Sequence, residues 1–562
     1  MEIPFSNGML SRLSRRGAAL DLMEEIEDDS AESLNASELL SDEPALLLQK
    51  MENRLVRHHL ANPDVLSSQQ LRKLRYILNF ARLADFEPGA AGPSGHRGRG
   101  DISVGAEIAP WRSRVTDALY GPLREETDAV TALTTARDML ASLEASQDDQ
   151  RNVLIERHGS DFSPTELDAE VGYKKLVTVF GGGGGAGFVY IGGIQRLLEA
   201  GQVPDYMIGS SFGAIIGSLV ARATPIPIDE YVDWAKTVSY RAILGPERLR
   251  RRHGLAGMFA LRFDQFAHTL LSRADGAQLR MSDLALPLDV VIAGVRRQPY
   301  AALPSKFRYP ERAAVKLRSL PFLPIGIGPW VGARMWQVAA FIDVRVVKPI
   351  VISDADQTRD VNVVDAASFS SAIPGVLHHE TSDPRMVPIL DDIFAEQDIA
   401  AMVDGGAASN VPVELAWKRV RDGRLGTRNA CYLAFDCFHP HWDPRHLWLA
   451  PITQAIQLQM MRNLPYADHL VRFEPTLSPV NLAPSAAAID RACTWGRSSV
   501  DPAIPVTSAL LAPTWWIGDG PPVRAAKPKI SAKSTASSMS AVMAAIQMPT
   551  SRFKRWRNRH LT

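Results

Sequence analysis

Apolar residues at helical spacing mark the first third of the chain. They form two runs in residues 45–84, which separate near Pro63, because proline cannot continue a helix. A third stripe runs through 123–157, with mostly polar residues on its other faces. The positions that define these stripes are Leu47, Met51, Leu55, Leu71, Leu74, Ile77, Leu78, Leu133, Ala136, Leu140 and Leu143. We therefore predict helices that brace or cover another domain.

From residue 174 onward, short apolar runs alternate with helical patterns. Lys174–Phe180 and Asp205–Ile208 are each followed by an apolar helical stretch, which gives strand, helix, strand, helix within about fifty residues. Further strand-like runs are Leu288–Ala293, Val344–Ile352 and Cys431–Asp436. This alternation is typical of a parallel sheet. The predicted fold is α/β, with a parallel-sheet core, a helical N-terminal extension and a mixed C-terminal extension.

Changes in composition along the chain predict the domain boundaries. Residues 1–43 are acidic, rich in Ser and poor in aromatics, which predicts disorder, and 88–100 have the Gly/Pro content of a flexible linker. We expect an acidic, partly disordered and helical region with this linker at 1–108, a helical extension at 109–170 and the core at 171–438. A C-terminal extension would follow at 439–523 and a basic, disordered tail at 524–562.

Charge and cysteine content exclude several classes of protein. The chain balances 62 basic against 62 acidic residues, so it has no bulk preference for nucleic acid. Its 3 cysteines lack the spacing of a disulfide framework or zinc site. The N-terminus lacks the pattern of a signal peptide. Residues 320–342 are the most apolar stretch, but prolines and Arg334 interrupt them, so we expect no transmembrane helix and a cytoplasmic protein.

The tail is the segment best suited to a membrane surface. Residues 524–562 hold nine Lys or Arg and no acidic residue, and Phe553 and Trp556 lie within the densest basic cluster. Each basic residue near an anionic bilayer contributes about 1 kcal/mol of attraction. We predict peripheral membrane attachment through this tail; a solvated appendage is the alternative.

A serine between two glycines is the first candidate for chemistry. Gly209-Ser210-Ser211-Phe212-Gly213 is a G-x-S-x-G that lies between a predicted strand and a predicted helix. Gly209 and Gly213 permit the tight turn that exposes a nucleophile above a sheet, and the following helix N-terminus favours negative charge nearby. Ser210 is the competing serine, but only Ser211 has glycine two places to either side.

A glycine-rich loop, Gly181–Gly187, follows the first predicted strand. Its backbone N–H groups could cradle a phosphate or form an oxyanion hole. No Gly-Lys-Ser/Thr follows, which argues against a Walker P-loop, and no acidic residue ends the next strand, which argues against a dinucleotide fingerprint. This loop and the serine turn would meet at one edge of a parallel sheet, which favours the oxyanion hole.

The third element is Asp404-Gly405-Gly406, followed by Asn410 and Pro412. Taken alone it is a common turn. In order and context, however, the glycine loop, the G-x-S-x-G and this Asp-Gly-Gly resemble the patatin-like phospholipases. The flanking segments Tyr190–Gly201 and Ala367–Gly375 are also similar to that family, so the resemblance covers about 174–225 and 365–415.

The resemblance implies a serine acyl hydrolase that cleaves ester bonds of phospholipids or related lipids. Ser211 would be the nucleophile and Asp404 its base, and the N–H groups of Gly183, Gly184 and Gly185 would form the oxyanion hole. No cofactor or metal is implied. Because a free aspartate titrates near ~3.9, Asp404 needs a shielded site to act as a base at neutral pH. Ala186 occupies the position that is basic in the family's glycine loop. The resemblance therefore implies hydrolysis of an acyl ester more strongly than it implies a phospholipid substrate.

Two alternatives stay open. The domain could be a non-catalytic lipid-binding or scaffolding module, or the chain could be a Ser-His-Asp carboxylesterase. For the esterase, the histidines that follow Asp404 are His439, His441, His446 and His469. His378 and His379 precede it and are interpreted as structural, and His439, His441 and Asp443 as a loop in preference to a metal site. Protein partners and acyl specificity are not predicted.

Overall fold

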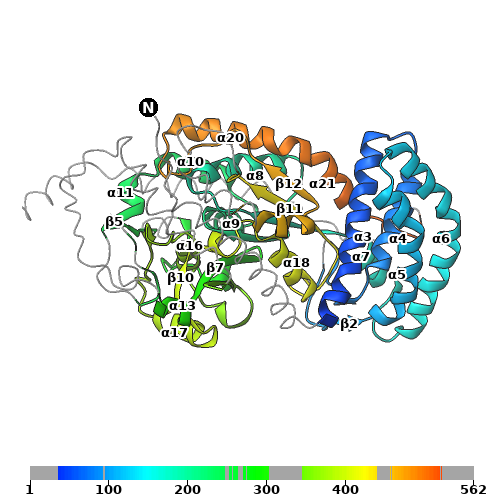
Figure 1. The fold of residues 1–562 in the computed structure, drawn as a ribbon, viewed down its shortest axis with the longest axis horizontal. Coiled ribbons are helices and arrows are strands. Elements are labelled where there is room, and N and C mark those ends of the chain that lie inside the picture. Colours follow the sequence, from blue (N-terminus) through cyan, green and yellow to red (C-terminus); the bar gives the residue numbers. More distant parts are fainter. Residues whose placement is uncertain are drawn as a thin grey trace, which may run out of the picture. The chain divides into compact units, whose positions relative to one another are not determined.

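A seven-stranded sheet forms the centre of the structure, which is a computed structural model (Figure 1). It describes residues 36–521 except 93–94, 247–251, 256, 258, 264–269, 274, 303–344, 440–455, 457–458 and 519. The strands of the sheet are β3 (Lys175–Phe180), β4 (Tyr206–Ser210), β7 (Leu288–Arg296), β8 (Val347–Ser353), β10 (Ile399–Val403), β11 (Ala430–Asp436) and β12 (His469–Arg472). The run β7-β4-β3-β11-β12 is parallel throughout, which confirms the predicted α/β class.

Strand β7 carries two strands end to end along one edge. β8 pairs with one edge of β7 from Asp289 to Val295. β4 pairs in parallel with the beginning of β7 as far as Val291, and β10 pairs in antiparallel from Arg296 back to Ala293. A strand has only two edges, so β4 and β10 share the edge opposite β8. Their C-terminal ends therefore point toward each other across a gap at the level of Ile292.

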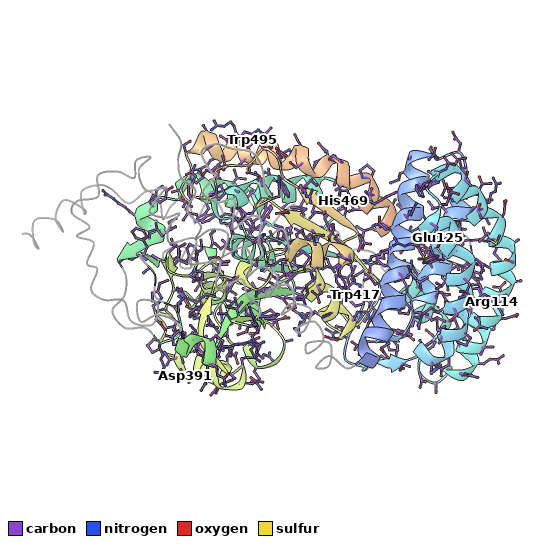
Figure 2. All side chains as sticks on the ribbon, viewed as in Figure 1. Arg114, Glu125, Asp391, Trp417, His469 and Trp495 are labelled. Carbon is purple, nitrogen blue, oxygen red and sulfur yellow. The ribbon has the colours of Figure 1, made fainter. Side chains whose placement is uncertain are left out.

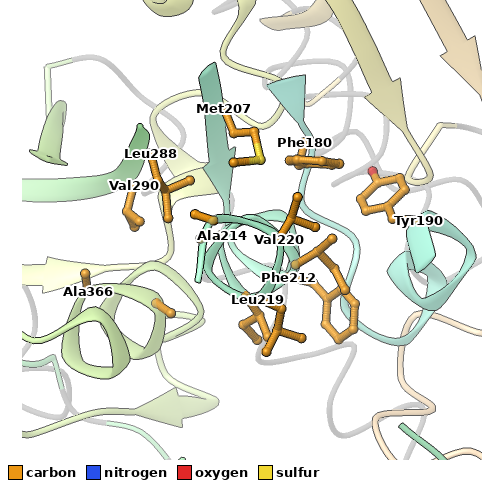
Figure 3. Packing of buried hydrophobic residues seen from close by; sticks show 14 of the residues in the cluster. Phe180, Tyr190, Met207, Phe212, Ala214, Leu219, Val220, Leu288, Val290 and Ala366 are labelled. Carbon is orange, nitrogen blue, oxygen red and sulfur yellow. The ribbon is translucent and has the colours of Figure 1, made fainter. Parts of the chain in front are cut away.

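Side chains alternate between the two faces of the sheet, as a pleated strand requires. Leu176 and Phe180 of β3 join the largest apolar cluster, whereas Val177 and Val179 join a second cluster on the other face. Helices α8 (Val189–Glu199), α9 (Phe212–Ala221), α16 (Val363–Ser370), α17 (Met386–Glu396) and α20 (Ala486–Val500) contribute to the first cluster, and α18 (Val413–Arg421) to the second. Figure 3 shows Phe180, Met207, Phe212 and Leu288 from the first cluster around α9. The sheet is thus covered on both faces.

The N-terminal helices form a bundle with an apolar core of their own (Figure 1). They are α3 (Ala36–Ala61), α4 (Ser68–Ala81), α5 (Gly105–Tyr120), α6 (Ala129–Arg157) and α7 (Pro164–Gly172). Capping boxes at Ser67 and Ser163 begin α4 and α7. The bundle joins the sheet region through buried polar contacts: Lys174 Nζ lies 2.9 Å from Glu52 Oε2, and Arg75 Nη1 donates to the carbonyl of Ala512 at 3.0 Å. The predicted helical extension is confirmed.

The remaining elements are short. A small sheet contains β5 (Leu244–Pro246), β6 (Phe259–Leu261) and β9 (Leu377–His378), and β1 (Asp85–Phe86) pairs with β2 (Ile102–Ser103). The other helices are α10 (Ile228–Thr237), α11 (Tyr240–Ile243), α13 (Arg297–Ala302) and α21 (Ile504–Leu511). Among the residues that the structure describes, no helix is long and apolar enough to cross a bilayer.

Several predicted segments meet the limits of the described residues. Helix α3 begins at Ala36, inside the stretch predicted to be disordered. Residues 1–35, the apolar stretch 320–342 and the tail 524–562 lie outside the described residues. In the Gly/Pro-rich stretch, the guanidinium of Arg97 donates to the carbonyl of Arg424 at 2.9 Å, and the carboxylate of Glu87 accepts from the N–H of Arg99 at 2.9 Å. The amino-acid composition of this stretch predicted a flexible linker and did not indicate these contacts.

Candidate active site

Ser211 lies at the turn between β4 and α9, in a backbone conformation that side chains rarely adopt, with φ of 52°. The flanking glycines make this turn possible. A Cβ on Gly209 would lie 2.6 Å from the carbonyl oxygen of Gly213, and a Cβ on Gly213 would collide with the carbonyl of Phe180. The strand, turn and helix thus place Ser211 at the C-terminal end of β4, as expected for a nucleophile elbow.

Asp404 comes directly after β10 and contacts Ser211. Ser211 Oγ donates to Asp404 Oδ2 at 2.6 Å, although the two residues are 193 positions apart in sequence. The other carboxylate oxygen, Oδ1, accepts from the N–H of Gly406 at 2.8 Å. The end-to-end arrangement of β4 and β10 on β7 brings these two residues together. Both are nearly buried, with 8% of Ser211 and 9% of Asp404 exposed.

Burial changes the acidity of Asp404. Loss of water raises the pKa of its carboxyl from 3.8 to about 6, although the hydrogen bonds from Ser211 and Gly406 oppose the rise. At neutral pH the group is therefore largely ionised, and it is a stronger base than an exposed aspartate. This is the shielded environment that a base partner of Ser211 requires.

The glycine loop lies against the serine. A Cβ on Gly182 would be only 2.8 Å from Cβ of Ser211. Gly184 has φ of 54°, and a Cβ there would collide with the carbonyl of Pro479. Within the described residues, the N–H groups of Gly183 and Gly184 have no hydrogen-bond acceptor. These two N–H groups are therefore the remaining candidate donors of the loop.

Gly185 requires a correction. The sequence suggested it as a third oxyanion donor, but its N–H donates to the carbonyl of Pro479 at 2.9 Å. That donor is already used to fix the loop against the segment around residue 480. Ala186, at the family's basic position, is fully buried in the main apolar cluster, where a charged side chain would be costly.

Two residues to which the sequence analysis assigned no role, Ser370 and Asn410, complete the site. The Ser370 hydroxyl accepts from the N–H of Ser211 at 2.8 Å and donates to the carbonyl of Val291 at 2.6 Å, so it fills the gap between β4 and β10. The Asn410 carbonyl accepts from the N–H of Gly182 at 3.1 Å and from the hydroxyl of Ser210 at 2.6 Å, which joins the loop to the elbow. Both residues lie in segments that carried the family resemblance, but their bonds involve backbone groups.

The described histidines bond to groups other than Ser211. His378 Nδ1 contacts the carbonyl of Leu255 at 2.8 Å, and His379 Nε2 contacts Asp365 at 2.9 Å. His439 Nε2 lies 3.2 Å from the carbonyl of Phe473, and His469 Nδ1 lies 2.9 Å from the guanidinium of Arg57. His441 and His446 lie outside the described residues. Among the residues that the structure covers, no group of acidic, His or Cys side chains could hold a metal, and Cys431, Cys437 and Cys493 are free and buried.

A family model covers the part of the chain that holds this site. Residues 178–417 match the family model described as patatin-like phospholipase. Uncharacterized NTE family proteins of Mycobacterium bovis and Mycobacterium tuberculosis are 37% identical over 70 residues, which is 12% of this chain and 19% of each relative. The chain thus spans about a fifth of the length of these curated relatives.

Proposed function

Because residues 178–417 contain a patatin-like phospholipase domain, and so belong to a family of lipid hydrolases, we propose that this protein cleaves lipid carboxylic esters through a dyad of Ser211 and Asp404. The observation that carries the proposal is the 2.6 Å hydrogen bond between Ser211 Oγ and Asp404 Oδ2, in a nearly buried site. The N–H groups of Gly183 and Gly184, which have no acceptor among the described residues, support it. The substrate would be a phospholipid or a related acyl ester.

The reaction would proceed in two halves. Ser211 Oγ attacks the ester carbonyl carbon while Asp404 takes its proton, and the oxyanion that forms accepts hydrogen bonds from Gly183 and Gly184. Collapse of this intermediate breaks the bond to the alcohol oxygen, which leaves with the proton from Asp404. Water then attacks the acyl-serine while Asp404 takes a proton from it. The bond between the acyl carbon and Ser211 Oγ breaks, the proton returns from Asp404 to Oγ, and the fatty acid leaves.

Fluorophosphonate labelling and lipid hydrolysis together test the dyad. Because the two residues act as one unit, Ser211→Ala and Asp404→Ala should each abolish nearly all turnover, and the double variant should be little worse. Ser218→Ala is a matched control, since this buried serine of α9 donates to the carbonyl of Ala214 in its own helix at 2.7 Å. Activity should survive EDTA. Additive losses, or an Asp404→Ala protein that turns over normally, would contradict the mechanism.

The alternatives predict other results. A wild-type protein that binds lipid but does not react with fluorophosphonate would be a scaffolding module. Loss of turnover on changing His439, His441, His446 or His469 to Ala would support the carboxylesterase. The bonds of His439 and His469 to groups away from Ser211 favour the dyad.

We also propose that the basic tail, 524–562, attaches the protein to anionic bilayers. Attraction between exposed charges weakens as salt shortens the screening length from ~10 Å at 0.1 M to ~3 Å at 1 M. Co-sedimentation with acidic vesicles should therefore fall with salt and with deletion of the tail, while hydrolysis of a soluble ester stays unchanged. Equal vesicle binding by the truncated protein would refute this attachment.

A further inference from the structure

A cavity of about 350 Å³ lies between helix α3 and the edge strand β12. Its lining residues are Gln49, Lys50, Asn53, Arg54, Arg57, Arg124, Leu464, Pro465, Ala467, Asp468, His469 and Leu470. Figure 2 labels His469 on its wall. β12 is separated from β4 by β11 and β3. At ~4.8 Å between neighbouring strands, the cavity is about 14 Å from the strand that bears Ser211.

Four cations line this cavity, and in the described part of the chain none has a carboxylate partner. Arg54 donates to the carbonyls of Arg124, at 2.7 Å, and Glu126. Arg57 donates to the carbonyl of Asp468 at 2.7 Å and to His469 Nδ1 at 2.9 Å. Across the residues with described side chains, Lys50 Nζ and the guanidinium of Arg124 form no hydrogen bond or ion pair. The N–H groups of these cationic side chains are therefore available to donate hydrogen bonds to a ligand.

Burial lowers the pKa of Arg57, and the carboxylate on the wall, Asp468, opposes this lowering. Asp468 is the only acidic residue among those that line the cavity. Its Oδ2 accepts from the N–H of Tyr432 at 2.8 Å, and its Oδ1 accepts from the amides of Gln49 at 3.2 Å and Asn53 at 3.3 Å. One turn along α3, by contrast, Glu52 pairs with Lys174 at 2.9 Å. Within the described residues, α3 thus pairs with a cation on its buried side through Glu52, whereas the cations at the cavity form no ion pair.

The basic groups also repel one another. Burial lowers the pKa of Lys50, and the charge of Arg124 lowers it further. Burial, followed by Arg57, lowers the pKa of His469 to about 4, and burial followed by Arg54 lowers that of His58. Like charges repel one another, and a bound anion would relieve this repulsion.

We propose that this cavity binds a phosphate group, either free or as the headgroup of an anionic lipid. A carboxylate brings one charge, whereas a phosphate monoester brings about −1.5 to −2 at pH 7, with three acceptor oxygens. Arginine side chains also match the geometry of phosphate oxygens, and charge-assisted bonds of this kind are among the strongest in proteins. This site is distinct from the Ser211 site and does not depend on the proposed hydrolysis.

The test is calorimetric titration of the full-length Ser211→Ala protein with inorganic phosphate, at ionic strength held constant with sodium chloride. Lys50→Gln is the most informative variant, because Lys50 has no protein partner among the described residues and its loss should not lower the melting temperature. Lys50→Gln and Arg57→Gln should each weaken phosphate binding by about tenfold or more. Lys50→Arg should retain it.

The control is Arg137→Gln, which removes an exposed arginine of α6 that pairs with Asp138 at 3.3 Å and should leave binding unchanged. Water-soluble dihexanoyl phosphatidic acid distinguishes the two sources of phosphate. Tighter binding than inorganic phosphate, with the same loss in Lys50→Gln, would assign a lipid headgroup, and equal binding would assign free phosphate. No phosphate binding by the parent protein, or equal binding by Lys50→Gln, would overturn the proposal.

Discussion

Replacing Asp404 with asparagine should stabilise the protein at neutral pH while it removes activity. The pKa of this carboxyl rises from 3.8 to about 6 on burial, so the folded state binds a proton more readily than the unfolded chain does. Stability that derives from this proton is complete below about pH 4 and is lost as pH rises through about 6. At roughly 1.4 kcal/mol per pH unit, the ionised carboxylate costs about 3 kcal/mol at pH 8.

Asparagine has nearly the same shape and no charge. Its oxygen can still accept from the N–H of Gly406, and the Ser211 hydroxyl can turn to accept from its amide. We therefore expect Asp404→Asn to be more stable than the parent by up to about 3 kcal/mol at pH 8, with the difference vanishing near pH 4. The assay is urea unfolding of both proteins at pH 4, 6 and 8.

Asp289 supplies a matched control of opposite sign. It too is buried, but its carboxylate pairs with Arg419 at 2.9 Å and Arg424 at 3.0 Å. Asp289→Asn removes the carboxylate that these two guanidinium groups share, although Arg424 keeps its ion pair with Asp354, and should destabilise by about 3–5 kcal/mol. An Asp404→Asn protein that is less stable than the parent at pH 8, or a difference that does not change with pH, would refute the reasoning.

Three further outcomes follow from the site. The kcat/KM for a soluble ester should fall about tenfold per pH unit below about pH 6, as Asp404 takes up a proton; a flat profile down to pH 4 would exclude it as base. Ser370→Ala should cost about 1–3 kcal/mol in urea unfolding and slow fluorophosphonate labelling, whereas Ser368→Ala, whose hydroxyl bonds only the carbonyl of Val364, should label normally. Gly184→Ala should lower turnover on the order of 100-fold. Its control is Gly201→Ala, because Gly201 also has a positive φ but has open space around it. Equal losses of turnover in the two variants would point to backbone strain alone.

Local chemistry explains why much of the fold could be predicted from the sequence. The strands beginning near 175, 206, 288, 347 and 430 are continuous apolar runs, as expected for a sheet that is covered on both faces. Ser211 could be identified from the sequence because the turn that carries it requires glycine at positions 209 and 213. Strand β10 was not predicted, although Ile399–Val403 is an apolar run directly before Asp404 and could have been recognised.

The missed parts of the site depend on contacts that sequence patterns do not encode. Gly185 looks like its neighbours in the sequence, and only the carbonyl of Pro479, almost three hundred residues later, removes its N–H from the available donors. Ser370 acts on the backbone of Ser211 and Val291, which any residue could supply. The cavity beside α3 brings Lys50 and Arg124 together only after the bundle has folded.

β4 and β10 share one edge of β7. Ser211 and Asp404 therefore lie at the ends of separate strands, which join the sheet separately during folding. The turn at Ser211 is formed by β4 and α9, which lie close together in the chain, although Ser370 and Asn410 also bond to it. Asp404 arrives only when β10 docks on the far half of β7. A molecule that has lost β10 from the sheet could therefore keep the strand and helix that flank Ser211 and yet lack Asp404, its proposed base. The reactivity of Ser211 would then be a more sensitive measure of whether the sheet is complete than the helix content of the protein.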